Sequence, residues 1–176
     1  CIDKVSDEEY RLLRTFQYIV IAQKIPSDIN EVNEQVRKLL ESGEIGLLFE
    51  LARTESDLPL WKRYSIEGKA YAHTGNLVKA QECYLKAIEM DKNNELYIEY
   101  GLLMLAMNQV QTALEIFNKV FQEEPKNIRL HLAMGQGYLQ MGNIQKSYEH
   151  LKYAFSNSYD YPSVLDLYIY VCEQLG

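Results

Sequence analysis

Three stretches of the chain repeat one pattern of small, aliphatic and aromatic residues at intervals of 33 and 34 residues. The pattern is clearest at its glycines, because Gly68, Gly101 and Gly135 keep these two spacings. Similar residues recur at the same spacings in the sets Leu77, Val110 and Ile144; Ala80, Ala113 and Ser147; Tyr84, Phe117 and Leu151; and Ala87, Val120 and Ala154. A period of about 34 residues is the length of one helix–turn–helix unit in a solenoid. Agreement is confined to small and apolar positions, which indicates shared packing rather than shared chemistry.

Residues that stop and start helices divide each repeat into two helices. Gly75-Asn76 and Gly142-Asn143 lie at the middle of the first and third repeats, and Asn108-Gln109 lies at the middle of the second. Gly, and after it Asn, is the residue type that best tolerates the left-handed conformation that ends a helix. The sequence therefore predicts helix pairs over 60–74 and 77–90, 94–107 and 110–123, and 128–141 and 144–156, with a last helix over 162–175.

The N-terminal third carries helix signals that do not follow the 34-residue spacing. Ser6 followed by Glu9 forms a capping box, which predicts a helix over about 7–24 that stops before Pro26. Two shorter helices, one after Asp28 and one over 44–53, form a degenerate hairpin. We expect about ten helices in all, divided into N-terminal helices at 1–58, three repeats at 59–161 (61–93, 94–127 and 128–161) and a capping helix at 162–176.

The three repeated glycines predict close contacts between the helices of a pair. A glycine inside a helix costs about 1 kcal/mol relative to alanine, so its presence at one position of every repeat indicates a gain from close approach. We expect the small residues of the second helix, such as Ala80 and Ala113, to face these glycines. The aromatic residues Tyr84 and Phe117 are then expected to fill the space between pairs.

The pattern resembles that of tetratricopeptide-repeat (TPR) proteins, in which an aromatic, a glycine and a tyrosine precede an alanine, an aromatic and a second alanine. The resemblance covers about Leu60 to Tyr161 and departs from the family at Asp91-Lys92, where Asp-Pro is usual. It implies an all-α fold, a right-handed α-solenoid of helix–turn–helix repeats. The residues that carry it are Tyr64, Gly68, Tyr71, Ala80, Tyr84 and Ala87; Tyr97, Gly101, Ala113, Phe117 and Pro125; and Gly135, Tyr138, Ser147 and Ala154.

Charge and composition narrow the classes of partner. The chain has 176 residues with 18 Lys and Arg against 25 Asp and Glu, a net charge of −7. This balance argues against a nucleic-acid partner, because phosphate binding needs a basic face. The most apolar run, Phe16 to Ala22, is too short for a transmembrane segment, which takes about 20 residues.

No arrangement of residues in the sequence indicates catalysis. There is no GxSxG, HExxH or P-loop motif, and Gly135-Gln136-Gly137 lies inside a predicted helix without a preceding strand. His73, His131 and His150 have no metal-ligating partner four residues on. We therefore expect a protein that is not an enzyme, with no catalytic residue, no metal ligand and no cofactor.

The resemblance also implies where a partner binds. First helices of TPR repeats line a concave groove that takes peptides, and the corresponding face here is apolar in the middle with cations towards its edges. An alternative stays open for Ile98 and Leu102, which could equally belong to the core. The predicted groove residues are Lys62, Ser65, Lys69, His73, Ile98, Leu102, Leu105, Arg129, Leu132, Gln136 and Leu139.

The groove residues favour an apolar or amphipathic peptide over an acidic one. One subclass of the family holds a C-terminal carboxylate with Lys, Asn and Arg side chains. Lys69 and Arg129 are present here, but Glu99 and its neighbours stand where a polar clamp would need Asn. The sequence therefore predicts a protein or peptide partner held by insertion of apolar side chains.

Two functional hypotheses follow. The first is a non-enzymatic scaffold for protein–protein interaction in the cytoplasm. The alternative is a bacterial secretion chaperone, or an envelope-assembly lipoprotein of a pilus or secretion system lipidated at Cys1. In that alternative the chain would be periplasmic or anchored to the outer membrane.

Overall fold

The computed structural model describes residues 29–54, 58–157 and 162–175, and within these ranges the chain is helical with no strand. The predicted helix boundaries are confirmed to within one residue from residue 45 onwards. The helix expected over 7–24 lies outside the described residues. The helices are α2 (Ile29–Ser42), α3 (Ile45–Thr54), α4 (Leu60–His73), α5 (Leu77–Met90), α6 (Asn94–Ala106), α7 (Val110–Glu123), α8 (Ile128–Gln140), α9 (Ile144–Asn157) and α10 (Pro162–Leu175).

The turns inside the three hairpins have the backbone conformation that the sequence predicts. Gly75, Asn108 and Gly142 all have positive φ, at 77°, 59° and 78°. In the first and third turns the next residue is an asparagine that caps the second helix. Asn76 Oδ1 accepts a hydrogen bond from Lys79 N at 3.3 Å, and Asn143 Oδ1 from Lys146 N at 3.1 Å.

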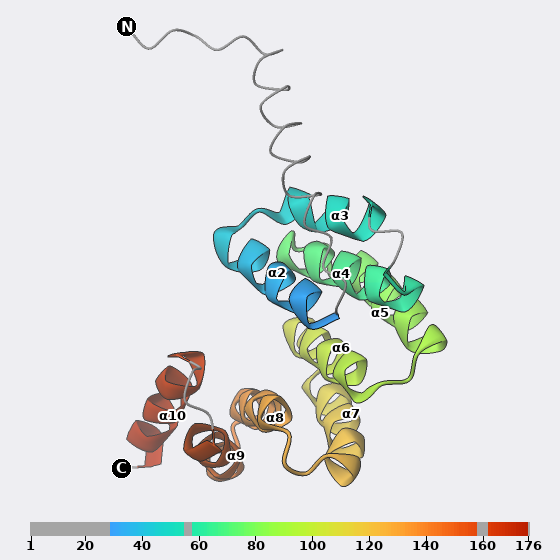
Figure 1. Cartoon of the computed structure of the whole chain (residues 1–176). Helices are drawn as coiled ribbons and strands as arrows, with labels where there is room; N and C mark the ends of the chain where they lie inside the picture. The colour runs from blue at the N-terminus through green and yellow to red at the C-terminus, as the bar shows by residue number, and fades with distance from the viewer. Residues whose placement is uncertain (1–28, 55–57, 158–161, 176) are drawn as a thin grey trace, which may run out of the picture.

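The helices stack in chain order into a curved array (Figure 1). Each helix packs against the next one along the chain, and α6 also packs against α8. The first helices of successive hairpins, among them α2, α6 and α8, lie on the inner side of the curve in Figure 1, and α3, α5 and α7 lie on the outer side. This arrangement places one row of first helices along a concave face.

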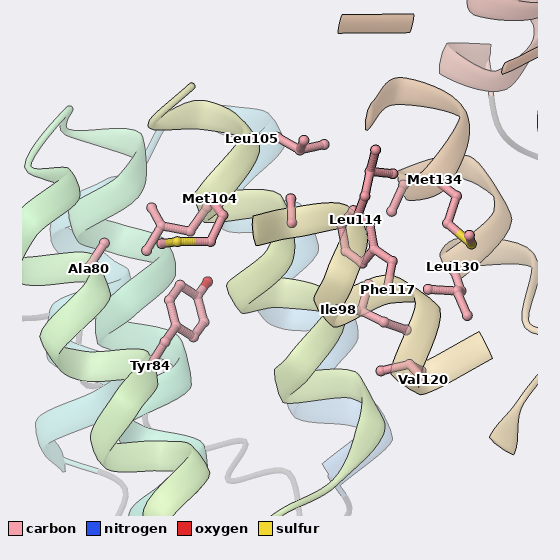
Figure 2. Close-up of a cluster of buried hydrophobic side chains, with 13 residues drawn as sticks. Ala80, Tyr84, Ile98, Met104, Leu105, Leu114, Phe117, Val120, Leu130 and Met134 are labelled. Atoms are coloured by element: carbon pink, nitrogen blue, oxygen red, sulfur yellow. The ribbon is translucent and has the colours of Figure 1, made fainter. Parts of the chain in front are cut away.

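Two clusters of buried side chains hold the stack together. The smaller one joins α2, α3 and α4 through residues such as Val36, Leu48 and Ile66. The larger one runs from α5 to α8, and Figure 2 shows Phe117 and Leu114 among side chains of the neighbouring helices. The larger cluster is therefore shared between successive hairpins, as expected where no single hairpin can bury its own apolar face.

The close contacts predicted between the repeated glycines and the second helix of each pair are present. A Cβ atom on Gly68 would lie 3.1 Å from the Tyr84 ring, one on Gly101 would overlap the Phe117 ring, and one on Gly135 would lie 2.6 Å from Leu151 Cγ. The glycines thus make room for the large residue on the second helix of their own hairpin, which reaches across to the facing backbone. A small residue also faces its glycine in the third hairpin, because the Ser147 hydroxyl donates a hydrogen bond to the Gly135 carbonyl oxygen at 2.8 Å.

Candidate functional site

The eleven predicted groove residues divide into three groups by burial. Lys62, Ser65, Ile98 and Leu105 are buried, and His73 is exposed at the end of α4. The remaining residues are half-buried, so that part of each side chain can contact a partner: Lys69, Leu102, Arg129, Leu132, Gln136 and Leu139. We call four of these, Leu102, Leu132, Gln136 and Leu139, the concave strip.

Ile98 and Leu105 belong to the core, which corrects their assignment to an open groove. Ile98 has no exposed surface and Leu105 is 6% exposed. A Cβ atom on Gly137 would lie 3.5 Å from Leu105 Cδ2, so Leu105 packs against α8. Helix α6 is apolar around most of its circumference and contacts α5, α7 and α8. A helix of this kind is buried on several faces, which is why the sequence pattern does not distinguish its core face from its groove face.

A buried carboxylate links three successive first helices beside the concave strip. Glu99 on α6 is 4% exposed. Its Oε2 accepts a hydrogen bond from the buried Ser65 hydroxyl on α4 at 2.7 Å. Its Oε1 lies 2.5 Å from Lys69 Nζ on α4 and 3.7 Å from Arg129 Nη2 on α8. These two contacts are ion pairs rather than hydrogen bonds, because Oε1 has no hydrogen-bond partner of normal geometry among the described residues.

The predicted groove lysines and arginine each contact a partner within the chain, and Lys69 and Arg129 are paired with carboxylates. Arg129 also pairs with Glu95, one turn before Glu99 on the same helix. Lys62 is 3% exposed and donates a hydrogen bond to Asn33 Oδ1 on α2 at 2.5 Å. Burial, reinforced by the nearby charge of Lys69, lowers the pKa of Lys62 to about 8. None of these three lysine and arginine side chains is an isolated cation at the edge of the groove.

A pocket of about 290 Å³ lies between α2 and the N-terminal ends of α4 and α6. Its lining includes Asn33 of α2, Trp61, Lys62 and Ser65 of α4, and Glu95 of α6. The chain contains one tryptophan. Trp61 fluorescence can therefore report on events in this pocket without an added label.

Comparison of the repeats reveals the unusual position of Glu99. The corresponding residues of the first and third repeats are Ile66 and Ala133, which are buried and apolar. A carboxylate at such a position must be paired, because an isolated buried charge is costly. A single acidic residue at an otherwise apolar repeat position is therefore the sequence signal for this network, and Glu99 is more than a departure from a carboxylate clamp.

A second polar cluster, missed in the sequence, joins α8 to α9. His131 Nε2 lies 3.0 Å from the Pro125 carbonyl oxygen, and His131 Nδ1 lies 3.1 Å from His150 Nδ1. A carbonyl only accepts, so His131 carries its proton on Nε2 and His150 donates from Nδ1. The two residues are 19 positions apart, beyond any helical spacing. Within the described ranges no group of three or more His, Cys, Asp or Glu side chains could hold a metal ion.

The histidine pair predicts a loss of stability in mild acid. Burial, with the charge of neighbouring His131, lowers the pKa of His150 to about 4, and burial also lowers the pKa of His131. Glu149 opposes this shift and Lys146 adds to it. The unfolded chain then binds more protons than the folded chain between pH 6.5 and 4. The contribution of the histidine pair to the free energy of unfolding is therefore fully present above pH 6.5 and is lost as the pH decreases. We expect a loss of about 1–3 kcal/mol across this range.

Denaturant unfolding at pH 7 and pH 5 measures this effect. The difference between the free energies of unfolding at pH 7 and pH 5 should shrink in His150→Gln. It should persist in His73→Gln, since His73 is exposed on α4. An unchanged pH difference in His150→Gln would assign the acid sensitivity to other groups.

The fold and the face it presents define the class of this protein. Among the described residues it is an α-solenoid of helix–turn–helix repeats whose first helices line the concave side of the stack. A family model described as Tetratricopeptide repeat matches residues 61–94, and a second with the same description matches residues 104–158. The chain belongs to the tetratricopeptide-repeat family.

Sequence relatives support the same assignment over parts of the chain. BBSome complex member BBS4 of Bos taurus is 32% identical over 84 residues, 48% of this chain and 16% of that protein. A TPR repeat-containing protein of Methanocaldococcus jannaschii is 28% identical over 124 residues, 70% of this chain and 36% of that protein. The chain thus spans about a sixth to a third of the length of these relatives.

Solved structures share the fold at low sequence identity. The APC/C hetero-tetramer Cut9–Hcn1 matches with a TM-score of 0.76 at 19% identity, over 89% of this chain and 31% of that one. The first TPR of Spaghetti (RPAP3), bound to the HSP90 peptide SRMEEVD, matches with a TM-score of 0.59 at 12% identity, over 65% of this chain and 92% of that one. Among the described helices, none is long and apolar enough to cross a membrane.

Proposed function

We propose that this protein is a non-enzymatic scaffold that binds an apolar or amphipathic segment of a protein partner on its concave face. The observation that carries the proposal is the concave strip. Leu102 on α6 and Leu132 and Leu139 on α8 stay half-buried although the core beneath them is complete. Apolar side chains gathered on one face of a repeat protein are typical of a binding surface.

The family context supports this reading. TPR repeats typically serve as interaction scaffolds, and the RPAP3 repeat named above holds a peptide. The concave face of this chain differs in its chemistry, because its cations are paired internally with Glu99 and Glu95. Apolar contact, rather than capture of an acidic end, is therefore the recognition mode that we propose.

Substitution of one strip leucine by aspartate tests the proposal. Leu102→Asp and Leu132→Asp place a charge on the proposed contact surface while part of each side chain can still reach water. We expect recovery of the partner in quantitative affinity purification to fall about tenfold or more. The melting temperature should stay within a few degrees of wild type.

The matched control is Leu85→Asp on α5, where the wild-type side chain is 43% exposed on a second helix. This variant adds the same charge away from the concave face and should leave recovery unchanged. Equal loss from Leu85→Asp, or full recovery with both concave variants, would place the partner elsewhere on the molecule.

The alternative function in bacterial secretion or envelope assembly depends on Cys1, which lies outside the described residues. It stays a prediction, as does the cytoplasmic location of the scaffold. Mass spectrometry of the native protein for a diacylglyceryl group on Cys1 distinguishes the two, since the scaffold hypothesis does not require a lipid.

A further inference from the structure

Within the ion-pair network, Glu99 is buried more deeply than the two cations that contact it. The side chain of Glu99 is 2% exposed, whereas those of Lys69 and Arg129 are 17% and 37% exposed. The two cations therefore lie between the buried carboxylate and the solvent of the concave face. A ligand that approaches this part of the face meets Lys69, Arg129 and its exposed partner Glu95 first, and Glu99 behind them.

A carboxylate in this position weakens the attraction of the two cations for an acidic ligand. Glu99 Oε1 already lies 2.5 Å from Lys69 Nζ. The Ser65 hydroxyl donates a hydrogen bond to Glu99 Oε2 at 2.7 Å and so holds the carboxylate in place. An acidic peptide would have to compete with this fixed partner, whose charge acts at short range in a poorly hydrated site. An apolar segment without carboxylates meets no such competition at the concave strip one turn further along α6 and α8.

We propose that Glu99 is a specificity-determining residue of the concave face, an internal carboxylate that excludes acidic peptide segments by occupying their binding position. Removal of its charge would turn Lys69 and Arg129 into a binding site for a peptide carboxylate. The inference rests on the proposed function, because it concerns which segment the concave face accepts. Selection against a wrong ligand by an unfavourable charge arrangement is a general route to specificity.

Two variants remove the charge in different ways. Glu99→Gln keeps the shape of the side chain and can keep the bond from Ser65. Glu99→Ile introduces an apolar residue like Ile66, which is fully buried at the corresponding place of the first repeat. Removal of one partner of a buried ion pair usually costs stability, because the other charge is left without its partner. Lys69 and Arg129 are 17% and 37% exposed and can be hydrated, so we expect both variants to fold. Circular dichroism and melting temperature establish that each variant is folded.

The binding experiment uses two synthetic amphipathic peptides of one leucine-rich sequence. The acidic peptide ends in two glutamates and a free carboxylate, and the neutral peptide ends in two glutamines and an amide. Trp61 fluorescence or calorimetry measures binding to each. We expect the acidic peptide to bind about tenfold or more tightly to Glu99→Gln and Glu99→Ile than to wild type, with the neutral peptide unchanged.

Three controls make the result specific. The gain should disappear at about 0.5 M salt, where surface charges are screened, and in the double variant Glu99→Gln with Lys69→Gln. The matched control Glu95→Gln also removes a carboxylate that contacts Arg129, but one whose side chain is 46% exposed, and it should give a much smaller gain.

Unchanged binding of the acidic peptide to both folded Glu99 variants would overturn the inference, as would an equal gain for the neutral peptide. Neither result would refute the proposal that the concave strip binds a partner, because Leu102→Asp and Leu132→Asp test that surface independently. If the proposed function itself is wrong, the partner should instead be recovered in full with Leu102→Asp and Leu132→Asp.

Discussion

Gly101→Leu is expected to destabilise the protein by about 3 kcal/mol or more. A Cβ atom at this position would already overlap the ring of Phe117, which has no exposed surface and cannot move towards solvent. Leucine would gain helix propensity over glycine, but that gain of about 1 kcal/mol is smaller than the cost of overpacking. For a chain of this size we expect the melting temperature to fall by about 10 °C.

Gly46→Leu is the matched control. Gly46 also lies in a helix, α3, but a Cβ atom there would meet nothing within 4 Å among the residues that the structure describes. The substitution should leave the melting temperature unchanged or raise it slightly, because glycine is the poorer helix former. If Gly101→Leu melted as high as Gly46→Leu, the close packing of α6 on α7 would be wrong.

Ile98→Asp is expected to unfold the protein or to cost more than about 3 kcal/mol. Ile98 lies in the main cluster and has no exposed surface, so the new carboxylate would lack both water and a counter-ion prepared for it. Denaturant unfolding should show a large loss of stability, together with a loss of helical signal at ordinary temperature if unfolding is complete.

Leu102→Asp, four residues further along α6, is the informative comparison. The same chemical change there should retain the fold, because Leu102 is only half-buried. Similar stability losses in the two variants would mean that Leu102 is core as well, and the concave strip would then be confined to α8.

The helices and turns could be predicted closely because local chemistry specifies them. Gly75, Asn108 and Gly142 take the left-handed conformation for which their residue types are suited. The repeat spacing then aligns equivalent positions of each hairpin without knowledge of the partner. The repeat spacing alone did not identify which side chain comes nearest to each glycine, such as Phe117 at Gly101, because that depends on side-chain length.

The candidate site was predictable only in part, because its chemistry depends on contacts between repeats. Leu132, Gln136 and Leu139 stay half-buried on α8 as a groove requires, whereas Ile98 and Leu105 are buried by neighbours on other sides of α6. The pairing of Lys69 with Glu99 joins residues 30 positions apart on different helices. Such a pair becomes visible only when the helices are placed side by side.

Site-specific photo-crosslinking tests the central claim, partner binding on the concave face, most directly. A photo-reactive amino acid is placed at Gln136 of the concave strip in one variant and at exposed Glu115 on α7 in another. We predict a discrete crosslinked adduct from position 136, absent from position 115 and lost when Leu132→Asp is added. An adduct from position 115 alone, or one from position 136 that survives Leu132→Asp, would contradict the account.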